Sequence, residues 1–290
     1  MSLITLTTDF GTKDHFVGAV KGAIFSELAD AKIIDITHEI SPFNVTETAY
    51  ILKNSYKSFP DGTIHIIGVD SELSADNKHI AIALDNHFFV CPDNGIISMI
   101  ASEIKPTKIV EINIHERVES SFPVLDVFVQ VACFIARGGN LTVVGKEITA
   151  FKKLIEIQPK VNQTQNQIIG SVIYIDHYGN VISDINKKMF QEIGKGRSFN
   201  ASVRGYSFSK IFTKYNEITG DNPHDSIQFD GNKLAIFNSA GYLEIALYRS
   251  NLDTTGGAST LLGLNYGDAI IIDFINDSKP DFTPINQVSI

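Results

Sequence analysis

Residues 63–69 form an almost continuous apolar run, Thr-Ile-His-Ile-Ile-Gly-Val, which ends at Asp70. A run of this kind fits a strand that is covered on both faces, and such strands are typical of parallel sheets. Helical periodicity flanks the run in segments 14–25, 45–56, 96–103 and 126–137. This pattern predicts an α/β amino-terminal domain with a mainly parallel sheet.

The first predicted strand also ends on an acidic residue. Residues 3–8 are apolar or β-branched, Asp9 follows them, and Gly11 permits a sharp turn before the first helix. Ligands of open α/β sheets gather at the carboxyl ends of the strands, so Asp9 and Asp70 are candidates to meet one. A buried carboxylate without partners is costly, which makes Asp70 the sharper candidate. The alternative is that Asp9 caps the turn and Asp14 caps the helix, as Asp often does.

The texture of the chain changes after a polar stretch rich in Gln and Asn at residues 158–167. Beyond it, short alternating runs separated by turn residues indicate an antiparallel sandwich or barrel. These runs are residues 168–176, 181–185, 234–238, 242–248 and 269–274. Because single cores seldom grow to 290 residues, we predict two domains. They are an α/β domain at 1–157 and a smaller β domain at 168–290, joined by a linker at 158–167. A strand pair is also predicted at 79–84 and 87–90, turned at Asp85 and Asn86.

Composition excludes several classes of protein. The net charge of −9 and the lack of a basic run argue against a nucleic-acid partner, whose binding sites need clustered Lys and Arg. No apolar run reaches membrane-spanning length and no leader pattern opens the chain, so we expect a cytoplasmic protein without a membrane partner. Cys91 and Cys133 lie in apolar runs without Cys-x-x-Cys spacing, which predicts buried free thiols in a reducing compartment.

No local sequence motif identifies a catalytic or metal-binding site by itself. The histidines show no metal-ligand spacing, and the chain has no Walker A, G-x-G-x-x-G or G-x-S-x-G sequence at a strand-to-helix junction. We therefore predict that the chain binds a small polar molecule and holds no metal.

Several short motifs are distributed in a fixed order along almost the whole chain. They are Thr7-Thr8-Asp9-Phe10-Gly11, Asp35-Ile36-Thr37-His38, Phe59-Pro60-Asp61-Gly62-Thr63, Val69-Asp70, Pro92-Asp93-Asn94-Gly95, Asp126-Val127-Phe128, Asp176 with Gly179-Asn180, and the run from Asn238 to Ala246. In order and spacing they resemble the S-adenosyl-L-methionine (SAM) hydroxide adenosyltransferase family, to which the fluorinase and chlorinase enzymes are related. No single motif is decisive, so the resemblance rests on the whole set.

The resemblance implies an α/β domain followed by a β-barrel-like domain. It also implies a homotrimer, in which an adenosyl ligand lies between one subunit's first domain and a neighbour's second. By this likeness Asp9 binds the ribose 2′ and 3′ hydroxyls, which are both donors. The other implied contacts are Asp14, Asp176 and Ser239 at the amino-acid end of the ligand, Asn180 at the adenine edge, and Phe43 and Tyr215 against the sugar and base. Ordinary core packing is the alternative for the two aromatic residues. The resemblance implies no cofactor, because SAM is the substrate.

The implied reaction is attack of water on C5′ of SAM, which yields adenosine and methionine. The positively charged sulfonium departs as a neutral thioether, so the protein must hold the water in line and supply a base or a stabilising charge. In the hydrolase members that the chain resembles, an Asp, an Arg and a His surround this water. Here Asp70 keeps the Asp, Asn77 stands in place of the Arg with Lys78 beside it, and Pro123 stands in place of the His.

These changes leave three hypotheses open. The first is a SAM hydrolase in which Asp70 and Lys78 do the catalytic work, although a lysine cannot reproduce the fork of a guanidinium. The second is a binding protein for adenosine or SAM that has lost catalysis, with Lys78 an ordinary solvated lysine. The third is a transferase that uses another nucleophile such as halide, which Asp70 would repel.

Overall fold

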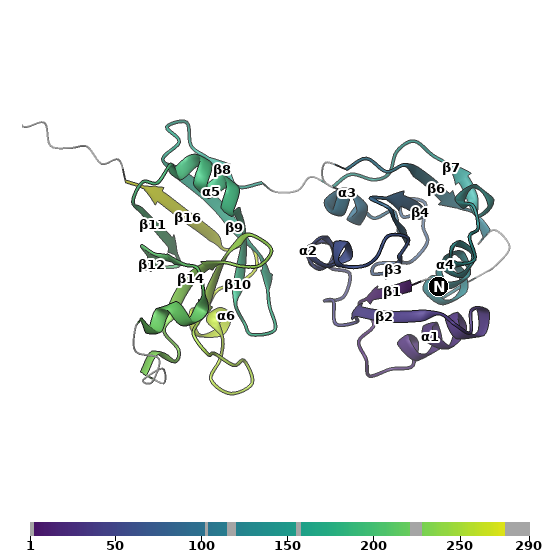
Figure 1. The fold of residues 1–290 in the computed structure, drawn as a ribbon, viewed down its shortest axis with the longest axis horizontal. Helices are drawn as coiled ribbons and strands as arrows, with labels where there is room; N and C mark the ends of the chain where they lie inside the picture. The colour runs from purple at the N-terminus through teal and green to yellow at the C-terminus, as the bar shows by residue number, and fades with distance from the viewer. Residues whose placement is uncertain (1–2, 102–103, 115–119, 155–157, 221–227, 276–290) are drawn as a thin grey trace, which may run out of the picture. The chain divides into compact units, whose positions relative to one another are not determined.

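The computed structural model describes residues 3–101, 104–114, 120–154, 158–220 and 228–275 (Figure 1). The chain divides into two compact units, Met1–Glu156 and Ile157–Ile290. Each unit has its own sheet and its own hydrophobic core.

The sheet of the first unit runs in the order β2-β1-β3-β5-β4-β6-β7. Its parallel part consists of β2 (Lys32–Thr37), β1 (Leu3–Thr8), β3 (Ile64–Gly68) and β5 (His87–Pro92). Its antiparallel part consists of β4 (His79–Leu84), β6 (Lys108–Ile112) and β7 (Gly145–Glu147). Every residue of β3 is buried, as a strand covered on both faces requires. The predicted α/β class is confirmed, and the sheet is mixed, with β1 and β3 at the centre of its parallel part.

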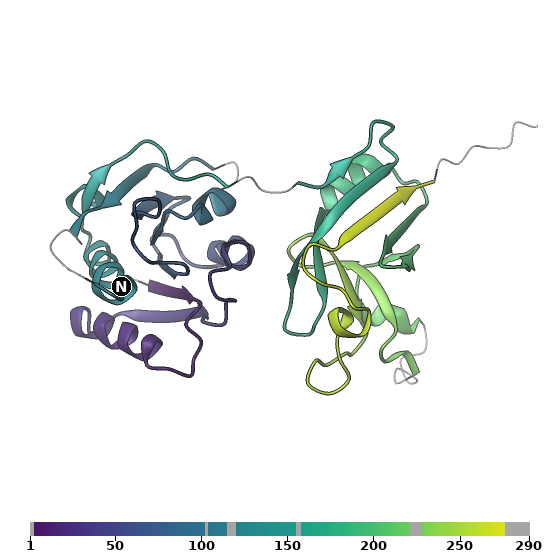
Figure 2. The same ribbon diagram turned by 180° about the vertical axis from the view of Figure 1, so that it is seen from behind.

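Helices cover both faces of this sheet (Figures 1 and 2). On one face, α1 (Phe16–Glu27) and α4 (Val129–Ala136) pack against Ile4, Leu6 and Ile66. On the other face, α2 (Val45–Ser55) and α3 (Ile96–Ala101) pack against Ile67. Alternate strand positions point to opposite faces, so these strands feed two separate cores. The short turns η1 (Tyr56–Ser58) and η4 (Leu141–Val143) complete the unit.

Several element boundaries differ from the predicted ones. α1 begins at Phe16 with His15 at its N-cap position, so the alternative reading of Asp14 as the helix cap is wrong. In the segment 126–137, a π-helical turn η3 (Val124–Phe128) precedes α4. The predicted turn at Asp85 and Asn86 is confirmed, since their φ angles of 52° and 62° suit a tight hairpin. Residues 102 and 103, at the end of the third predicted helix, lie outside the described residues.

The sheet of the second unit runs in the order β12-β11-β16-β9-β10-β15-β14-β13, with β8 paired to β9. The strands are β8 (Lys160–Val161), β9 (Gln167–Ile175), β10 (Val181–Asn186), β11 (Phe199–Val203), β12 (Tyr206–Phe208), β13 (Ile211–Phe212), β14 (Lys233–Phe237), β15 (Tyr242–Leu247) and β16 (Ala269–Phe274). The curved, nearly closed sheet confirms the predicted barrel-like class (Figure 1). The helical elements α5 (Lys187–Gly194), α6 (Ala258–Leu261) and η5 (Tyr215–Thr219) accompany it.

Two elements of this unit, β8 and α5, were not predicted from the sequence. Within the stretch expected to be a linker, Lys160 and Val161 form β8, because Asn162 Oδ1 accepts the backbone N–H groups of Asn166 and Gln167 and closes a turn onto β9. Helix α5 is a short amphipathic helix whose Phe190 contacts three other phenylalanine rings.

Cys91 and Cys133 are buried free cysteines, as predicted. Within the part of the chain that the structure describes, no helix is long and apolar enough to cross a membrane. In the same part, no group of three or more His, Cys, Asp or Glu side chains is placed to hold a metal ion.

A buried chain of polar side chains crosses the face of the first sheet that α2 covers. Thr5 Oγ1 lies 2.7 Å from His65 Nδ1, and His65 Nε2 lies 3.1 Å from His87 Nδ1. Burial, together with the neighbouring His87, lowers the pKa of His65 to about 3. Burial also lowers the pKa of His87. The folded protein therefore keeps both rings neutral at neutral pH.

We expect the protein to lose stability as the pH falls below about 6.5, the ordinary pKa of histidine. In this window the unfolded chain takes up protons, whereas His65 stays neutral in the folded protein down to about pH 3. The free energy of unfolding should fall by up to about 1.4 kcal/mol per pH unit for each such histidine. Urea unfolding between neutral pH and about pH 4 measures this slope. A His65→Gln variant with the same slope as the parent would contradict the assignment.

Candidate functional site

The carboxyl ends of β2, β1 and β3 lie side by side at one edge of the first sheet. Thr7 pairs with Thr37 of β2, and Thr8 pairs with Gly68 of β3. Asp9 directly follows Thr8, and Asp70 comes two residues after Gly68. The register therefore brings Asp9 and Asp70 to the same edge of the sheet, where ligands of such folds bind.

Asp9 is half-buried and holds a neighbouring loop. Its Oδ2 accepts the backbone N–H of Phe43 at 2.9 Å, and no described residue is hydrogen-bonded to its Oδ1. Phe43 has a φ of 62°, and its side chain is 71% exposed. The carboxylate thus fixes an unusual backbone conformation with one oxygen and keeps the other available. The exposed ring of Phe43 contradicts the core-packing alternative for this residue.

Asp14 lies in the exposed segment between Gly11 and α1, and no hydrogen bond or ion pair links its side chain to the described residues. Two aromatic residues flank Asp14 in the sequence, and a third packs against them from the segment before η3. Phe10, Phe16 and Phe122 pack in contact, with ring centroids 5.3 to 5.9 Å apart. An apolar wall therefore stands next to the strand end that carries Asp9.

Asp70 has a left-handed backbone conformation, with φ at 48°. Side chains hold the loop around it: the carbonyls of residues 69–72 accept hydrogen bonds, in order, from Asn94, Asn77, His79 and again Asn77, at 3.1, 2.8, 3.0 and 3.0 Å. Among the described residues, none is hydrogen-bonded or ion-paired to the Asp70 carboxylate. Strained backbone of this kind persists only when its surroundings enforce it, and it gathers at functional sites. We call these donors, Asn77, His79 and Asn94, the carbonyl clamp.

Asn77 and Pro123 are the residues expected at the positions of the family Arg and His, with Lys78 beside Asn77. Asn77 is a member of the carbonyl clamp. Lys78 accepts the backbone N–H of Asp93 through its carbonyl at 2.6 Å, and its ammonium forms no ion pair within the described residues. Pro123 precedes η3, whose Val124 packs so close to Gly68 that a Cβ at Gly68 would lie 2.9 Å from it. An apolar side chain therefore packs against the end of β3 directly after Pro123.

Replacing Asn77 with Asp should destabilise the protein by about 1–3 kcal/mol, because a carboxylate oxygen would face two carbonyl oxygens in place of two donated hydrogen bonds. Urea unfolding measures the change. Asn54→Asp is the matched control, since the amide of Asn54 donates a single hydrogen bond on the exposed side of α2. Equal losses in the two variants would contradict a clamp at Asn77.

In the second unit, Asp176 organises the turn between β9 and β10. Its Oδ1 accepts the backbone N–H groups of Tyr178 and Asn180, both at 2.9 Å. Its Oδ2 accepts the amide of Asn180 at 3.0 Å. Asn180 is buried, and its side-chain oxygen is left to accept a hydrogen bond from a donor such as an amino group. The structure thus joins Asp176 and Asn180 in one turn.

Tyr215 lies near this turn and is held by Glu244, a residue that the sequence patterns did not single out. The Tyr215 hydroxyl donates to Glu244 Oε1 at 2.5 Å, and the side chain of Asn238 also hydrogen-bonds Glu244. Burial raises the pKa of Glu244, as does the nearby charge of Asp176. Burial and Glu244 likewise raise the pKa of the Tyr215 phenol. Glu244 is the one charged residue in the otherwise uncharged strand β15, and this is the sequence signal that could have identified it as a site residue.

Ser239 is exposed in the turn between β14 and β15. The neighbouring Asn238 Oδ1 shapes that turn by accepting the backbone N–H groups of Ala240 and Tyr242, both at 3.1 Å. The structure therefore brings Asp9, Phe43 and Asp70 together in the first unit, and Asp176, Asn180 and Tyr215 together in the second.

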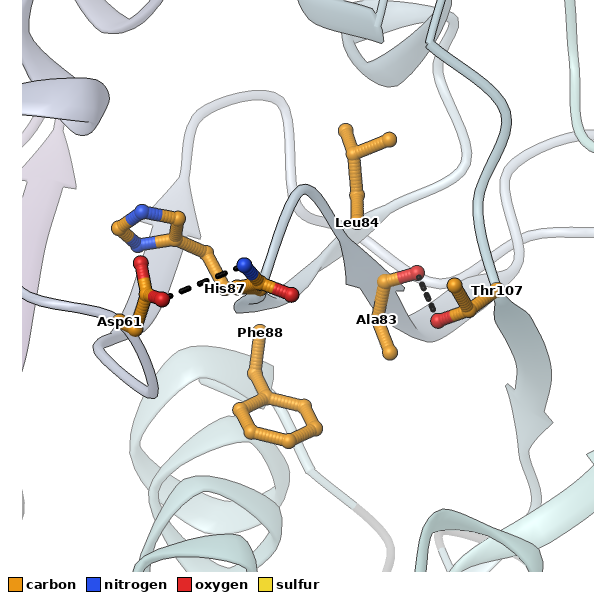
Figure 3. A pocket seen from close by; sticks show the side chains of 7 residues that line it. Asp61, Ala83, Leu84, His87, Phe88 and Thr107 are labelled. Atoms are coloured by element: carbon orange, nitrogen blue, oxygen red, sulfur yellow. Dashed lines mark hydrogen bonds between the residues drawn. The ribbon is translucent and has the colours of Figure 1, made fainter.

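A cavity of about 470 Å³ lies elsewhere in the first unit, near the β4–β5 turn (Figure 3). It is lined by Asp61, Ala83, Leu84, Asn86, His87, Phe88 and Thr107. Some of its polar groups are hydrogen-bonded to each other: the Asn86 amide donates to Asp61. The Thr107 hydroxyl donates to the Ala83 carbonyl (Figure 3). None of the predicted site residues lines this cavity.

Comparison with protein families matches both units. Residues 4–145 match the SAM hydroxide adenosyltransferase N-terminal domain, and residues 170–271 match the C-terminal domain.

Individual relatives are similar over almost their whole length. The chain is 31% identical over 284 residues to "(R)-S-adenosyl-L-methionine hydrolase" of Methanocaldococcus jannaschii, covering 94% of this chain and 96% of the relative. It is 21% identical over 286 residues to a fluorinase of Actinopolyspora mzabensis, covering 86% and 92%. A crystal structure of an uncharacterized conserved protein from Thermotoga maritima superposes with a TM-score of 0.78 at 29% identity, covering 94% of this chain and 100% of that one.

Proposed function

The chain belongs to the SAM hydroxide adenosyltransferase family, and we propose that it hydrolyses SAM to adenosine and L-methionine. The observation that carries the proposal is the Asp70 carboxylate, which has no hydrogen-bond or ion-pair partner among the described residues. It lies on the loop that the carbonyl clamp holds, at the same sheet edge as Asp9. Relatives named for this activity, among them one that is 31% identical over 94% of this chain, support it.

The proposed role of Asp70 is to hold the attacking water and to accept its proton. The water oxygen forms a bond to C5′ while the bond from C5′ to sulfur breaks, and the electron pair of that bond stays on sulfur. The sulfonium becomes a neutral thioether, so no residue has to protonate the leaving group. A carboxylate with no competing partner among the described residues is suited to accept a hydrogen bond from water and then its proton.

The proposed binding groups divide between the two units. Asp9 accepts hydrogen bonds from the two ribose hydroxyls, one through Oδ1 and one through Oδ2, which also accepts the Phe43 N–H. The exposed Phe43 ring covers the sugar. In the second unit, Asn180 meets the adenine edge and Tyr215 lies against the base. The proposed contacts to the amino-acid end are Asp14, Asp176 and Ser239, and the carboxylates of the two aspartates attract its ammonium group.

A second candidate, a protein that binds adenosine or SAM without turnover, has one observation in its favour. Pro123, the residue expected at the position of the family His, can take no proton, and Asn77, expected at the position of the Arg, supplies no positive charge. With neither a cation nor an imidazole there, Asp70 would have to activate the water alone or with Lys78.

A turnover experiment separates the two candidates. Purified protein is incubated with SAM, and adenosine and methionine are quantified by chromatography, with calorimetry run in parallel. Equal amounts of the two products, formed above the rate without protein, are expected from a hydrolase. Binding without product would leave the binding protein as the function.

We also propose a cytoplasmic homotrimer, in which each ligand lies between the first domain of one subunit and the second domain of its neighbour. The resemblance of the motifs supports this assembly, as does the division of the candidate residues between the two units. Analytical ultracentrifugation is expected to give the mass of three chains. A monomer at working concentration would contradict it.

A further inference from the structure

A chain of four side chains leads from the surface to the strand end before Asp9. Thr8 Oγ1 lies 2.8 Å from His38 Nδ1, and His38 Nε2 lies 3.2 Å from Asp35 Oδ1. The other oxygen of Asp35 accepts a hydrogen bond from the Lys21 ammonium. Thr8 and His38 are buried, at 1% and 4% exposure, while Asp35 and Lys21 are part-exposed. We call this chain the Thr8–His38 relay.

Asp35 anchors the outer end of the relay. Burial raises the pKa of the Asp35 carboxyl, but the hydrogen bond from Lys21 and the neighbouring His38 outweigh it, and the pKa lies below its usual range. His38 Nε2 lies within ion-pair distance of Asp35 Oδ1, although its direction is not that of a hydrogen bond. Thr8 Oγ1 also accepts the backbone N–H of Phe10 at 3.4 Å. The hydrogen bond between Thr8 Oγ1 and His38 Nδ1 is therefore the contact that joins His38 to the strand end.

The order Thr, His, Asp resembles a set that activates a nucleophile, but this geometry excludes that role. Thr8 is almost completely buried, and its oxygen is occupied by the Phe10 N–H. A nucleophile must present its oxygen to a substrate. The relay therefore acts on structure.

Backbone hydrogen bonds join the residues on both sides of Asp9 to the segment that carries His38. The carbonyl of His38 accepts the N–H of Gly11 at 2.7 Å, and the carbonyl of Thr8 accepts the N–H of Ile40 at 3.4 Å. Thr8 and Gly11 are thus bonded to His38 or its loop directly, and Phe10 is bonded to the Thr8 hydroxyl that contacts His38. Asp9 is the residue between these anchors.

We propose that His38, acting through the Thr8 hydroxyl, is a positioning residue that aims the Asp9 carboxylate at the ribose diol of the adenosyl ligand. The inference rests on the proposed function, because it assumes that Asp9 binds the ligand. It assigns to His38 a role in the affinity for the sugar, whereas Asp70 is the residue proposed to activate the water. Cutting the link between His38 and Thr8 should therefore weaken binding more than cutting the link between His38 and Asp35.

Two substitutions cut these links separately. In His38→Asn, the amide oxygen can take the place of Nδ1 and accept from Thr8, while the contact to Asp35 is lost. In His38→Gln, the longer amide can take the place of Nε2 and donate to Asp35, while the contact to Thr8 is lost. Isothermal titration calorimetry with adenosine gives the affinity of each variant, and thermal unfolding shows that each is folded.

We expect His38→Gln to weaken adenosine binding by about 3- to 10-fold, the usual effect of one lost hydrogen bond, and His38→Asn to weaken it less. Thr8→Val should reproduce the loss, and Thr8→Ser should restore most of the affinity because it keeps the hydroxyl. This second pair decides the matter if the His38 variants do not fold. Equal affinity in Thr8→Val and the parent protein would overturn the proposal.

The result is separable from a failure of the proposed function. If the parent protein binds neither adenosine nor SAM, the function fails and the relay proposal, which rests on it, falls with it. If the parent binds adenosine and the Gln and Val variants bind equally well, only the positioning role is wrong.

Discussion

Replacing Asp70 with Asn is expected to lower the rate of SAM hydrolysis by about 100-fold or more, the usual effect of losing a general base. The amide keeps the size of the side chain but cannot take the proton of the attacking water. Asp70 already has a left-handed backbone conformation, which Asn tolerates as well as Asp does. Adenosine affinity should stay within about twofold, since the predicted sugar contacts do not involve Asp70.

The measurement is steady-state product formation by the Asp70→Asn variant, with calorimetry on the same preparation. Asp76→Asn is the matched control, because Asp76 is an exposed carboxylate in the same loop. If the Asp70 variant kept the parent rate, water activation would have to come from elsewhere, and Lys78→Ala would then be the next variant to measure. If adenosine binding were lost along with turnover, Asp70 would be a binding residue.

Replacing Asp9 with Ala is expected to weaken adenosine binding by about 100-fold. The change removes a charged acceptor for two hydroxyl donors, and hydrogen bonds to charged groups contribute about 1.5–3 kcal/mol each. It also frees the Phe43 N–H, which Asp9 Oδ2 now accepts, so the loop that carries the aromatic ring is expected to loosen.

Two further variants separate these effects. Asp9→Asn keeps an acceptor for Phe43 but loses the charge, so its adenosine affinity should fall between the parent and Asp9→Ala. Asp30→Ala, at an exposed carboxylate in the turn after α1, should bind as the parent does. Parent-like adenosine affinity in Asp9→Ala would show that the ribose contact is wrongly assigned.

The carbonyl clamp explains how the Asp70 loop keeps its conformation. Neutral amides of Asn77 and Asn94, with the imidazole of His79, satisfy four consecutive carbonyls. Because these donors are bonded to the carbonyls, they fix the loop that carries Asp70, and the neutral amides add no positive charge that could stabilise a hydroxide. Because the sulfonium leaves as a neutral thioether, positioning is the larger requirement in this reaction. Turnover slower than in members with all three residues is the consistent expectation.

Much of the first unit could be predicted from the sequence because its signals are local. The apolar run at 63–69 became the fully buried strand β3, and the turn at Asp85 and Asn86 became the β4–β5 hairpin. Placement of Asp9 and Asp70 at strand ends followed from the same runs. Helix α5 and strand β8 could not be predicted in this way, since they are short and depend on Asn side chains that close turns and cap helices.

The sequence by itself determined the fold class, the two kinds of domain and the acidic residues at strand ends, because periodicity and turn residues act over a few neighbouring positions. Only the tertiary structure decided what surrounds those acidic residues. His38 meets Thr8 across 30 residues, Glu244 meets Tyr215 across 29, and Asn94 meets the Val69 carbonyl across 25. Such contacts depend on strand register and on loop conformation, where a shift of one residue turns every side chain to the other face. The opening run at 63–69 therefore specified a strand, whereas the availability of the Asp70 carboxylate beyond it was set by residues from other strands and loops.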